Sequence, residues 1–310
     1  MRRKSERITM HLCSNKMRDI YQNSAVLKNY YHLTKPGIIY GNAITVAGGF
    51  FLASKGYIDL RLFLAALAGI SFIIASGCVF NNYIDRKIDA KMARTKNRAL
   101  ANGAISVQRA ITFAIMLGML GIFVLGTFTN LLALCAALAG AFFYIVVYSL
   151  WTKRRSVYGT LVGSISGAVP PVVGYVAVVN GLDLGALILF LILALWQMPH
   201  SYAIAIYRLP DYKDAGIPVL PAIRGIQRTK WEILMYTGLF VAATTMLFVF
   251  GYVGAFYLVV MSTLGLSWLF LSLRGFGVKD DKKWARGMFL FSLVIIILFS
   301  FLISAPTRLL

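Results

Sequence analysis

Three side chains that carry oxygen donors, Asn81, Asp85 and Asp89, stand four residues apart where a long apolar run ends. Four residues of α-helix turn through about 400°, so each side chain is displaced by only about 40° from the one before it. We therefore expect them to line one stripe of a helix. Oxygen ligands of this kind suit Mg²⁺, which typically takes one or two carboxylates together with phosphate oxygens of a substrate.

Basic side chains follow the stripe within one or two helical turns, at Lys91, Arg94, Lys96 and Arg98. Two carboxylates one turn apart repel each other unless a cation lies between them. The stripe and the basic residues could therefore form a site for a metal-bound, phosphorylated group. The plainer interpretation is a polar helix end followed by a solvated loop at a membrane surface, and the spacing alone leaves both open.

The composition of the chain indicates what kind of element carries this stripe. Of the 310 residues, 59% are hydrophobic and 14% are charged, and the mean hydropathy is +0.75. A soluble domain of this length would carry more charge on its surface. We therefore predict an all-α, polytopic membrane protein.

The formal net charge of +20 could suggest a nucleic-acid partner. The basic residues, however, lie between apolar runs, a pattern that favours the membrane surface and anionic or phosphorylated ligands. We expect membrane lipids as partners and no nucleic acid. The three cysteines have neither metal-ligand nor disulfide spacing, so they indicate little about the redox compartment.

Apolar runs of about 20 residues recur from Pro36 onward, and each is long enough to cross a bilayer. Lys55, Arg61 and Arg308 fall on one side of the predicted membrane, and all other lysines and arginines fall on the opposite side. The positive-inside rule then places the N-terminus in the cytoplasm and the C-terminus outside. The membrane that we predict is the inner (plasma) membrane of a bacterium. The nine predicted spans are 36–54, 62–82, 107–127, 130–150, 157–179, 184–206, 231–250, 252–273 and 286–305.

Two predicted cytoplasmic loops, 83–106 and 207–230, are much longer than the external connections. Function often collects in such loops, and both carry acidic and basic residues. We predict that the two loops meet over one cavity and cap it. Residues 1–29 are polar and basic without an apolar core of signal-peptide length, so we predict a disordered cytoplasmic lead before a transmembrane domain over 30–310.

The second long loop contains Asp211 and Asp214 at i, i+3, with Arg208 before them. These residues could bind metal or substrate, or they could belong to a solvated loop. Three prolines in the same loop should prevent a long helix and favour a fixed, extended cover. They are Pro210, Pro218 and Pro221.

His200 lies within an apolar run and is preceded by Trp196 and Pro199. A histidine in a membrane span can simply hydrogen-bond to a neighbouring helix. Ionisable residues in a span are nevertheless costly and tend to mark functional sites. The sequence around His200 favours neither interpretation.

Tyr144 and Tyr148 lie one helical turn apart and lead into the basic run Lys153, Arg154 and Arg155. This pattern is typical of an aromatic belt with cationic anchors at the membrane interface. The alternative is a site that holds a diphosphate, with the tyrosines lining a cavity below it.

A metal stripe and basic side chains at the mouth of an apolar bundle suit a substrate with a diphosphate head and a long apolar tail. Mg²⁺ and the cations would hold the diphosphate and stabilise charge as the C–O bond breaks. The bundle would hold the tail and keep water from the allylic cation. Prenyl transfer is the simplest reaction with these needs, and the chain has no P-loop or dinucleotide fingerprint in a suitable context.

The segment from Asn81 to Asp89, followed by RTKNR, resembles the first NxxxDxxxD motif of the UbiA superfamily of membrane prenyltransferases. Within this superfamily the chain resembles the haem O synthases from about residue 30 to its end. Four segments carry that resemblance in the same order and spacing. They are TKPGII (34–39), SGCVFNNYIDRKIDAKMARTKNR (76–98), SVYGTLVGSISGAVPPVVGY (156–175) and WQMPHSYAIAIYRLPDYKDAGIPVLP (196–221).

The resemblance implies a nine-helix bundle of the UbiA type and transfer of the farnesyl group of farnesyl diphosphate to a vinyl group of protohaem IX. Water would add in the same reaction, and the products would be haem O and diphosphate. Mg²⁺ is the implied metal, and haem b is a substrate rather than a cofactor. Haem-copper oxidase assembly or a haem A synthase are the protein partners that such a product suggests.

The same resemblance assigns roles to residues of this chain. Asn81, Asp85 and Asp89 would be metal ligands, and the two carboxylates would be catalytic together with His200, whose MPH segment is typical of haem O synthases. The second motif departs from the DxxxD of the wider superfamily, because its two aspartates stand at i, i+3. The predicted substrate-binding residues are Asn82, Arg94, Lys96, Arg98, Tyr148, Lys153, Arg208, Asp211 and Asp214.

Two other functions fit parts of the pattern. An aromatic prenyltransferase of quinone biosynthesis would need the same metal stripe. A transporter of an anionic lipid or metabolite should carry polar residues at mid-membrane, whereas the charges here gather at one rim. A purely structural subunit of oxidase assembly would need no stripe at Asn81, Asp85 and Asp89.

Overall fold

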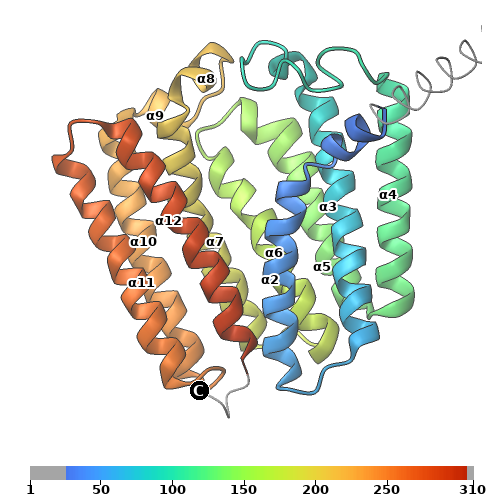
Figure 1. Ribbon diagram of the computed structural model, residues 1–310, viewed down its shortest axis with the longest axis vertical. Helices are drawn as coiled ribbons and strands as arrows, with labels where there is room; N and C mark the ends of the chain where they lie inside the picture. Colours follow the sequence, from blue (N-terminus) through green and yellow to red (C-terminus); the bar gives the residue numbers. More distant parts are fainter. Residues whose placement is uncertain (1–25, 306–310) are drawn as a thin grey trace, which may run out of the picture.

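The computed structural model describes residues 26–305, and all regular secondary structure in that range is helical. Within it, nine helical segments are long and apolar enough to cross a membrane, which confirms the predicted number of spans. They stand side by side as one bundle (Figure 1). Together with two short helices of the second long loop, α8 (Leu209–Asp214) and α9 (Leu220–Ile223), the α-helices from Pro36 onward are α2 (Pro36–Ser54), α3 (Leu60–Asp89), α4 (Val107–Phe128), α5 (Leu131–Phe142), α6 (Gly159–Val179), α7 (Leu184–Tyr207), α10 (Gly225–Val249), α11 (Ala255–Arg274) and α12 (Asp281–Ser304).

Three shorter segments complete the chain trace. A π-helix, η1 (Phe143–Trp151), continues α5 and leads into a 3₁₀ turn, η2 (Thr152–Arg154), and a second 3₁₀ turn, η3 (Gly275–Gly277), follows α11. The predicted fourth span, 130–150, is therefore helical from Leu131 onward, but its last turns are wider than an α-helix. Short π-helical segments are often found at functional sites.

Helix α3 is the longest helix and carries the oxygen-bearing stripe. It begins at the N-cap Asp59, whose Oδ1 accepts hydrogen bonds from the backbone N–H groups of Arg61 (2.9 Å) and Leu62 (3.0 Å). At 1.5 Å per residue, its 30 residues exceed the thickness of a bilayer core. The helix continues beyond the predicted span 62–82 to Asp89, so the whole stripe is helical, as its spacing predicted.

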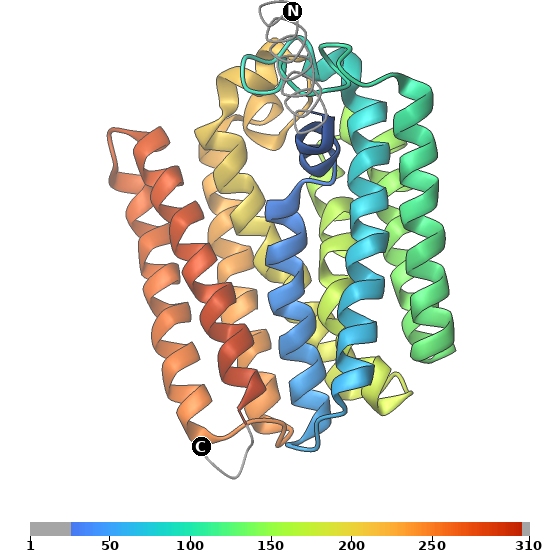
Figure 2. The ribbon, with the colours of Figure 1, turned by 45° about the vertical axis from the view of Figure 1, so that its right-hand side comes forward.

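Helix α2 packs against α6, α12 and α3 near the middle of the bundle (Figures 1 and 2). Two glycines allow the closest of these approaches. A Cβ added to Gly49 would lie 2.0 Å from the carbonyl oxygen of Pro171, and one added to Gly174 would lie 2.2 Å from that of Val46. Small residues at such contacts let membrane helices approach backbone to backbone.

The two long loops lie at the same end of the bundle, which we call the loop end (Figure 1, top). Residues from both loops line one cavity, as predicted. The extended cover expected for the second loop is wrong, because that loop contains the short helices α8 and α9. Pro210 and Pro221 are the second residues of these helices, in the first turn, where a missing N–H breaks no helical hydrogen bond.

Residues 26–33 form a further helical segment at the loop end. Leu33 is buried there, and the ring of Tyr30 packs edge-on against Phe113 of α4 with centroids 5.0 Å apart. The predicted domain boundary at residue 30 thus falls inside a helix. Of the lead 1–29 that was predicted to be disordered, residues 26–29 are helical, and residues 1–25 lie outside the described residues, as does Arg308.

Candidate active site

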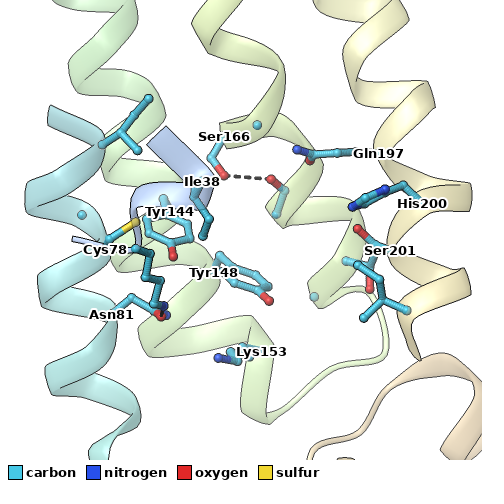
Figure 3. A pocket seen from close by; sticks show the side chains of 18 of the residues that line it. Ile38, Cys78, Asn81, Tyr144, Tyr148, Lys153, Ser166, Gln197, His200 and Ser201 are labelled. Carbon is cyan, nitrogen blue, oxygen red and sulfur yellow. Dashed lines mark hydrogen bonds between the residues drawn. The ribbon is translucent and has the colours of Figure 1, made fainter. Parts of the chain in front are cut away.

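A cavity of about 590 Å³ extends from the loop end into the bundle. Helices α2, α3, α6, α7 and α12 line it together with η1 and both long loops. Figure 3 shows the side chains that project into it from opposite walls. Its charged groups gather toward the loop end, and its deeper walls are mainly apolar and aromatic with a few neutral polar side chains such as Ser166 and Gln197.

Asp85 is the most heavily contacted charge in the cavity and only 2% of its surface is exposed. Lys153 donates to its Oδ2, and Arg154 Nη2 lies 3.3 Å from its Oδ1. The amide nitrogen Nδ2 of Asn81 also donates to Oδ2, at 3.1 Å. A buried carboxylate is stable when its charge is paired and its lone pairs accept hydrogen bonds.

Asn81 links α3 to two other segments. Its Oδ1 accepts a hydrogen bond from Lys35, and its Nδ2 donates to Ser149 Oγ of η1 at 2.9 Å. Lys35 precedes the first residue of α2 in the left-handed backbone region, with φ of 52°. Burial lowers the pKa of Lys35 to about 8, and the nearby cations Arg98 and Lys153 act in the same direction.

Asp89, one turn further along α3, is bound by the first long loop. Arg98 Nη1 donates to its Oδ2 at 2.8 Å, and Thr95 Oγ1 donates to its backbone carbonyl at 3.0 Å. Arg94 of the same loop also lines the cavity. Cationic side chains therefore outnumber carboxylates at this rim, which favours an anionic ligand.

The oxygen donors of Asn81, Asp85 and Asp89 suit a hard cation such as Mg²⁺. Within residues 26–305, no group of three or more His, Cys, Asp or Glu side chains could hold a metal ion by itself. Two carboxylates and one amide match a Mg²⁺ site that is completed by phosphate oxygens and water. The residues present therefore fit a metal that binds together with a diphosphate.

The π-helix η1 contributes two tyrosines to the cavity wall. Their rings stack with centroids 6.1 Å apart and an angle of 16° between planes, and the ring of Tyr148 lies 5.9 Å from Lys153 Nζ. Ser149 Oγ donates to the carbonyl of Tyr144, five residues earlier, at 2.8 Å. The wide turn thus places the two stacked tyrosines next to Lys153, on the side of it that faces the deeper cavity (Figure 3).

The opposite wall is built around His200 of α7 (Figure 3). The imidazole stacks on Trp196, with ring centroids 4.6 Å apart, and lies 5.1 Å from the ring of Phe289. Its Nδ1 is 2.7 Å from Ser292 Oγ of α12. This wall therefore offers a flat aromatic surface with one polar edge.

Such a cavity can bind a diphosphate at its rim and apolar groups within the bundle. A model of the UbiA prenyltransferase family matches residues 42–294. The chain belongs to the UbiA prenyltransferase family. The matched range includes both α3 and the second long loop.

Curated relatives resemble this UbiA chain over most of its length. "Protoheme IX farnesyltransferase 2" of Pseudomonas fluorescens strain Pf0-1 is 53% identical over 288 residues, which cover 92% of this chain and 98% of the relative. "Protoheme IX farnesyltransferase" of Cronobacter sakazakii is 54% identical over 279 residues, which cover 90% of this chain and 95% of the relative.

Solved structures share the UbiA fold at lower sequence identity. A structure of digeranylgeranylglyceryl phosphate synthase is 23% identical, with a TM-score of 0.75 over 90% of this chain and 98% of that chain. A UbiA homologue from Archaeoglobus fulgidus bound to DMAPP and Mg²⁺ is 18% identical, with a TM-score of 0.67 over 89% of this chain and 99% of that chain. At these identities the likeness establishes the fold.

The structure brings most of the predicted site residues together in the UbiA cavity. Those that line it come from α3, the first long loop, η1, η2 and α7. They are Asn81, Asp85, Asp89, Arg94, Arg98, Tyr148, Lys153 and His200.

Five predicted residues do not line this cavity. Asn82 is buried and donates from Nδ2 to the carbonyl of Leu33 at 2.8 Å, and its own Oδ1 is unpaired within the described chain. Arg208 lies 4.0 Å from Asp211, and both belong to the outer part of the second loop. The substrate-binding roles of all five remain predictions, including those of the exposed Lys96 and Asp214.

Several residues at the site were not predicted. Lys35 was quoted only as part of the TKPGII segment, although it reaches Asn81 from a position 46 residues away. Tyr212, two residues before the predicted Asp214, is the member of α8 that lines the cavity. Contacts between distant segments have no spacing signal in the sequence, so residues such as Ser149 and Ser292 could not be found from it.

Proposed function

We propose that this chain transfers the farnesyl group of farnesyl diphosphate to a vinyl group of protohaem IX and produces haem O. The observation that carries the proposal is the division of one cavity into a cationic rim with an Asn81-Asp85-Asp89 stripe and an aromatic wall with His200. The rim suits a diphosphate, and the wall suits a flat, apolar macrocycle. The relatives named protoheme IX farnesyltransferase support haem as the acceptor.

At the rim, Asn81, Asp85 and Asp89 would hold Mg²⁺, which supplies charge neutralisation for the departing diphosphate. The UbiA homologue solved with DMAPP and Mg²⁺ supports a divalent metal in this family. Lys35, Lys153 and Arg98 lie close enough to these donors to bind the phosphate oxygens. Their ammonium and guanidinium groups then stabilise the negative charge that develops on diphosphate.

The reaction balances with one water. The terminal vinyl carbon of protohaem bonds to C1 of the farnesyl group, and the bond from C1 to the diphosphate oxygen breaks. Water adds to the inner vinyl carbon and releases a proton, which leaves a hydroxyl group there. The apolar interior holds the farnesyl chain and limits the water that can capture the allylic carbon.

Nine membrane-spanning helices make the chain a multi-pass membrane protein. We place it in the bacterial inner membrane with the loop end toward the cytoplasm, because the loop end carries the basic loops. The diphosphate site would then face a soluble pool of Mg²⁺. Delivery of the product to haem-copper oxidase assembly or to a haem A synthase fits its lipid-soluble character.

Haems extracted from cells with and without this chain test the proposal directly. Chromatography and mass spectrometry should detect haem O only in cells that express it. A prenylated hydroxybenzoate in place of haem O would instead indicate the quinone-type reaction, in which the same rim would act on a different acceptor. The absence of both products would contradict prenyl transfer to either acceptor.

A further inference from the structure

A second cavity, of about 580 Å³, lies beside the first at the loop end. We call it the vestibule; the helical segment 26–33, the start of α2 and the first long loop contribute to its walls (Figure 2, dark blue and teal). Asn29, His32 and Asn97 line the vestibule and not the active-site cavity. The residues that line both cavities are Lys35, Gly37, Ile38, Arg94 and Arg98. The two cavities therefore meet along one common boundary.

The common boundary is cationic. Lys35 donates to Asn81 Oδ1 and Arg98 donates to Asp89 Oδ2, so two of its cations contact the oxygen-bearing stripe directly. Arg94, the third cation, is exposed. None of the described residues that line the vestibule is acidic. Since a recess lined by one sign of charge concentrates ions of the opposite sign, the attraction of the rim for anions continues into the vestibule.

The vestibule is polar from the boundary to the aqueous side of the loop end. His32 and Asn97 are exposed, and both side chains can donate hydrogen bonds. Asn82 is only 2% exposed and lies on the inner wall, where its Nδ2 donates to the carbonyl of Leu33 at 2.8 Å. This hydrogen bond ties the segment 26–33 to α3, so the helix that carries the stripe also holds the wall of the vestibule.

The proposed reaction yields two products with opposite solubility. Haem O is largely apolar and can pass into lipid. Diphosphate carries several negative charges, and moving it past the mainly apolar deeper walls would be costly. It must therefore leave the rim for water at the loop end, along a path that offers cations and hydrogen-bond donors.

We propose that diphosphate leaves the active site through the vestibule, past Lys35 and Arg98 at the boundary and past Arg94 and Asn97 to the aqueous phase. This inference rests on the proposed function, which supplies the diphosphate. Successive cations let the anion exchange one charged partner for the next, so it is never left without a charge-assisted hydrogen bond. A lipid phosphate has the same chemistry, and the experiment below separates the two sources.

Exchange of radiolabelled inorganic diphosphate tests the route on the full-length protein, with Mg²⁺ and without haem b, in phosphatidylcholine vesicles. The double variant Asn29→Trp/Asn97→Trp places bulky neutral side chains on two walls of the vestibule. An obstruction raises the barrier equally in both directions, so the association and dissociation rates should each fall about 10-fold. The Kd for diphosphate should stay unchanged, which would also show that the rim is intact.

Turnover gives a second, independent measurement. In wild type, diphosphate should appear in solution as fast as haem O forms. In the double variant, the first turnover should form haem O at the wild-type rate, whereas free diphosphate should appear later. Such a lag separates slow release from slow chemistry.

Ala104→Trp is the matched control. Ala104 is exposed in the same loop and lines neither cavity. The same bulky side chain at this position should leave both exchange rates unchanged and produce no lag.

Three outcomes would overturn the inference. Exchange rates of the double variant equal to those of wild type would mean that diphosphate takes another path. A weaker Kd with an unchanged association rate would make the vestibule part of the binding site rather than a route. An effect that appears only when phosphatidylglycerol is added to the vesicles would assign the vestibule to lipid phosphates. A wild-type protein that forms no haem O would contradict the proposed function, whereas the exchange rates would still decide the route.

Discussion

The cationic rim and the aromatic wall of the cavity hold their polar groups in opposite ways. At the rim, one carboxylate, Asp85, has three polar partners, namely Lys153, Arg154 and Asn81. At the wall, His200 has a single polar partner, Ser292, which is oriented by two further contacts. The rim is a shared network of charges, whereas the wall is a linear relay of neutral groups.

This difference indicates how each half responds to change. In a shared network, the loss of one peripheral cation leaves others to hold the central carboxylate. In a relay, each member determines the position of the next. We therefore expect substitutions at the rim to range widely in effect according to how central the residue is, and substitutions at the wall to act mainly on the acceptor substrate.

The largest effect should follow Asp85→Asn, which removes the charge that three rim residues share. Farnesyl transfer should fall about 10³-fold, as is typical when a group that organises a preformed electrostatic site is lost. Rates measured over a range of Mg²⁺ concentrations would check this. Asp59→Asn on the same helix is the control, since asparagine also caps helices well; full Mg²⁺-dependent activity of Asp85→Asn would contradict the metal assignment.

Lys35→Met should have the next largest effect. It removes the cation that reaches Asn81 from outside α3, and the KM for farnesyl diphosphate should rise about 10- to 100-fold, the usual cost of a hydrogen bond to a charged group. Lys28→Met, at an exposed position on the preceding helical segment, should leave KM unchanged. Equal KM values for the two variants would mean that Lys35 does not contact the diphosphate.

Trp196→Phe should perturb the wall more gently, because phenylalanine can still stack on His200. The indole N–H that binds the carbonyl of Ser292 would be lost, so haem affinity should fall about 2- to 10-fold with little change in the KM for farnesyl diphosphate. Trp268→Phe is a close control, since that indole also donates to a carbonyl of α12, at Met288. Similar haem affinities of the two variants would argue against the relay.

The smallest effect should follow Arg154→Ala. The side chain of Arg154 is 37% exposed, and Lys153 also binds Asp85, so the transfer rate should fall only about 2- to 5-fold. Steady-state rates at low and high ionic strength would measure it. A fall in the transfer rate as large as that of Asp85→Asn would show that Lys153 and Asn81 cannot hold Asp85 without Arg154.

Sequence patterns predicted the rim far better than the wall. The stripe from Asn81 to Asp89 follows helical periodicity, and hydropathy with loop charge predicted the number of spans and the pairing of the long loops. The π-helical turn after α5 and the short helices α8 and α9 were not predicted, because proline and aromatic residues are compatible with several backbone paths.

Residues joined only by tertiary contact were missed for a different reason. His200 and Ser292 are 92 residues apart, and Lys35 and Asn81 are 46 apart. No local spacing records such contacts. Resemblance pointed toward His200, but its tautomer and its orientation depend on α12, which carries no motif.

The most direct test of the central claim is diphosphate release by the purified protein in lipid vesicles supplied with farnesyl diphosphate and Mg²⁺. Release should begin when haem b is added and should match haem O formation one to one. It should stop on chelation of Mg²⁺. Release that proceeds equally without haem b, or that responds to 4-hydroxybenzoate and not to haem b, would contradict the account.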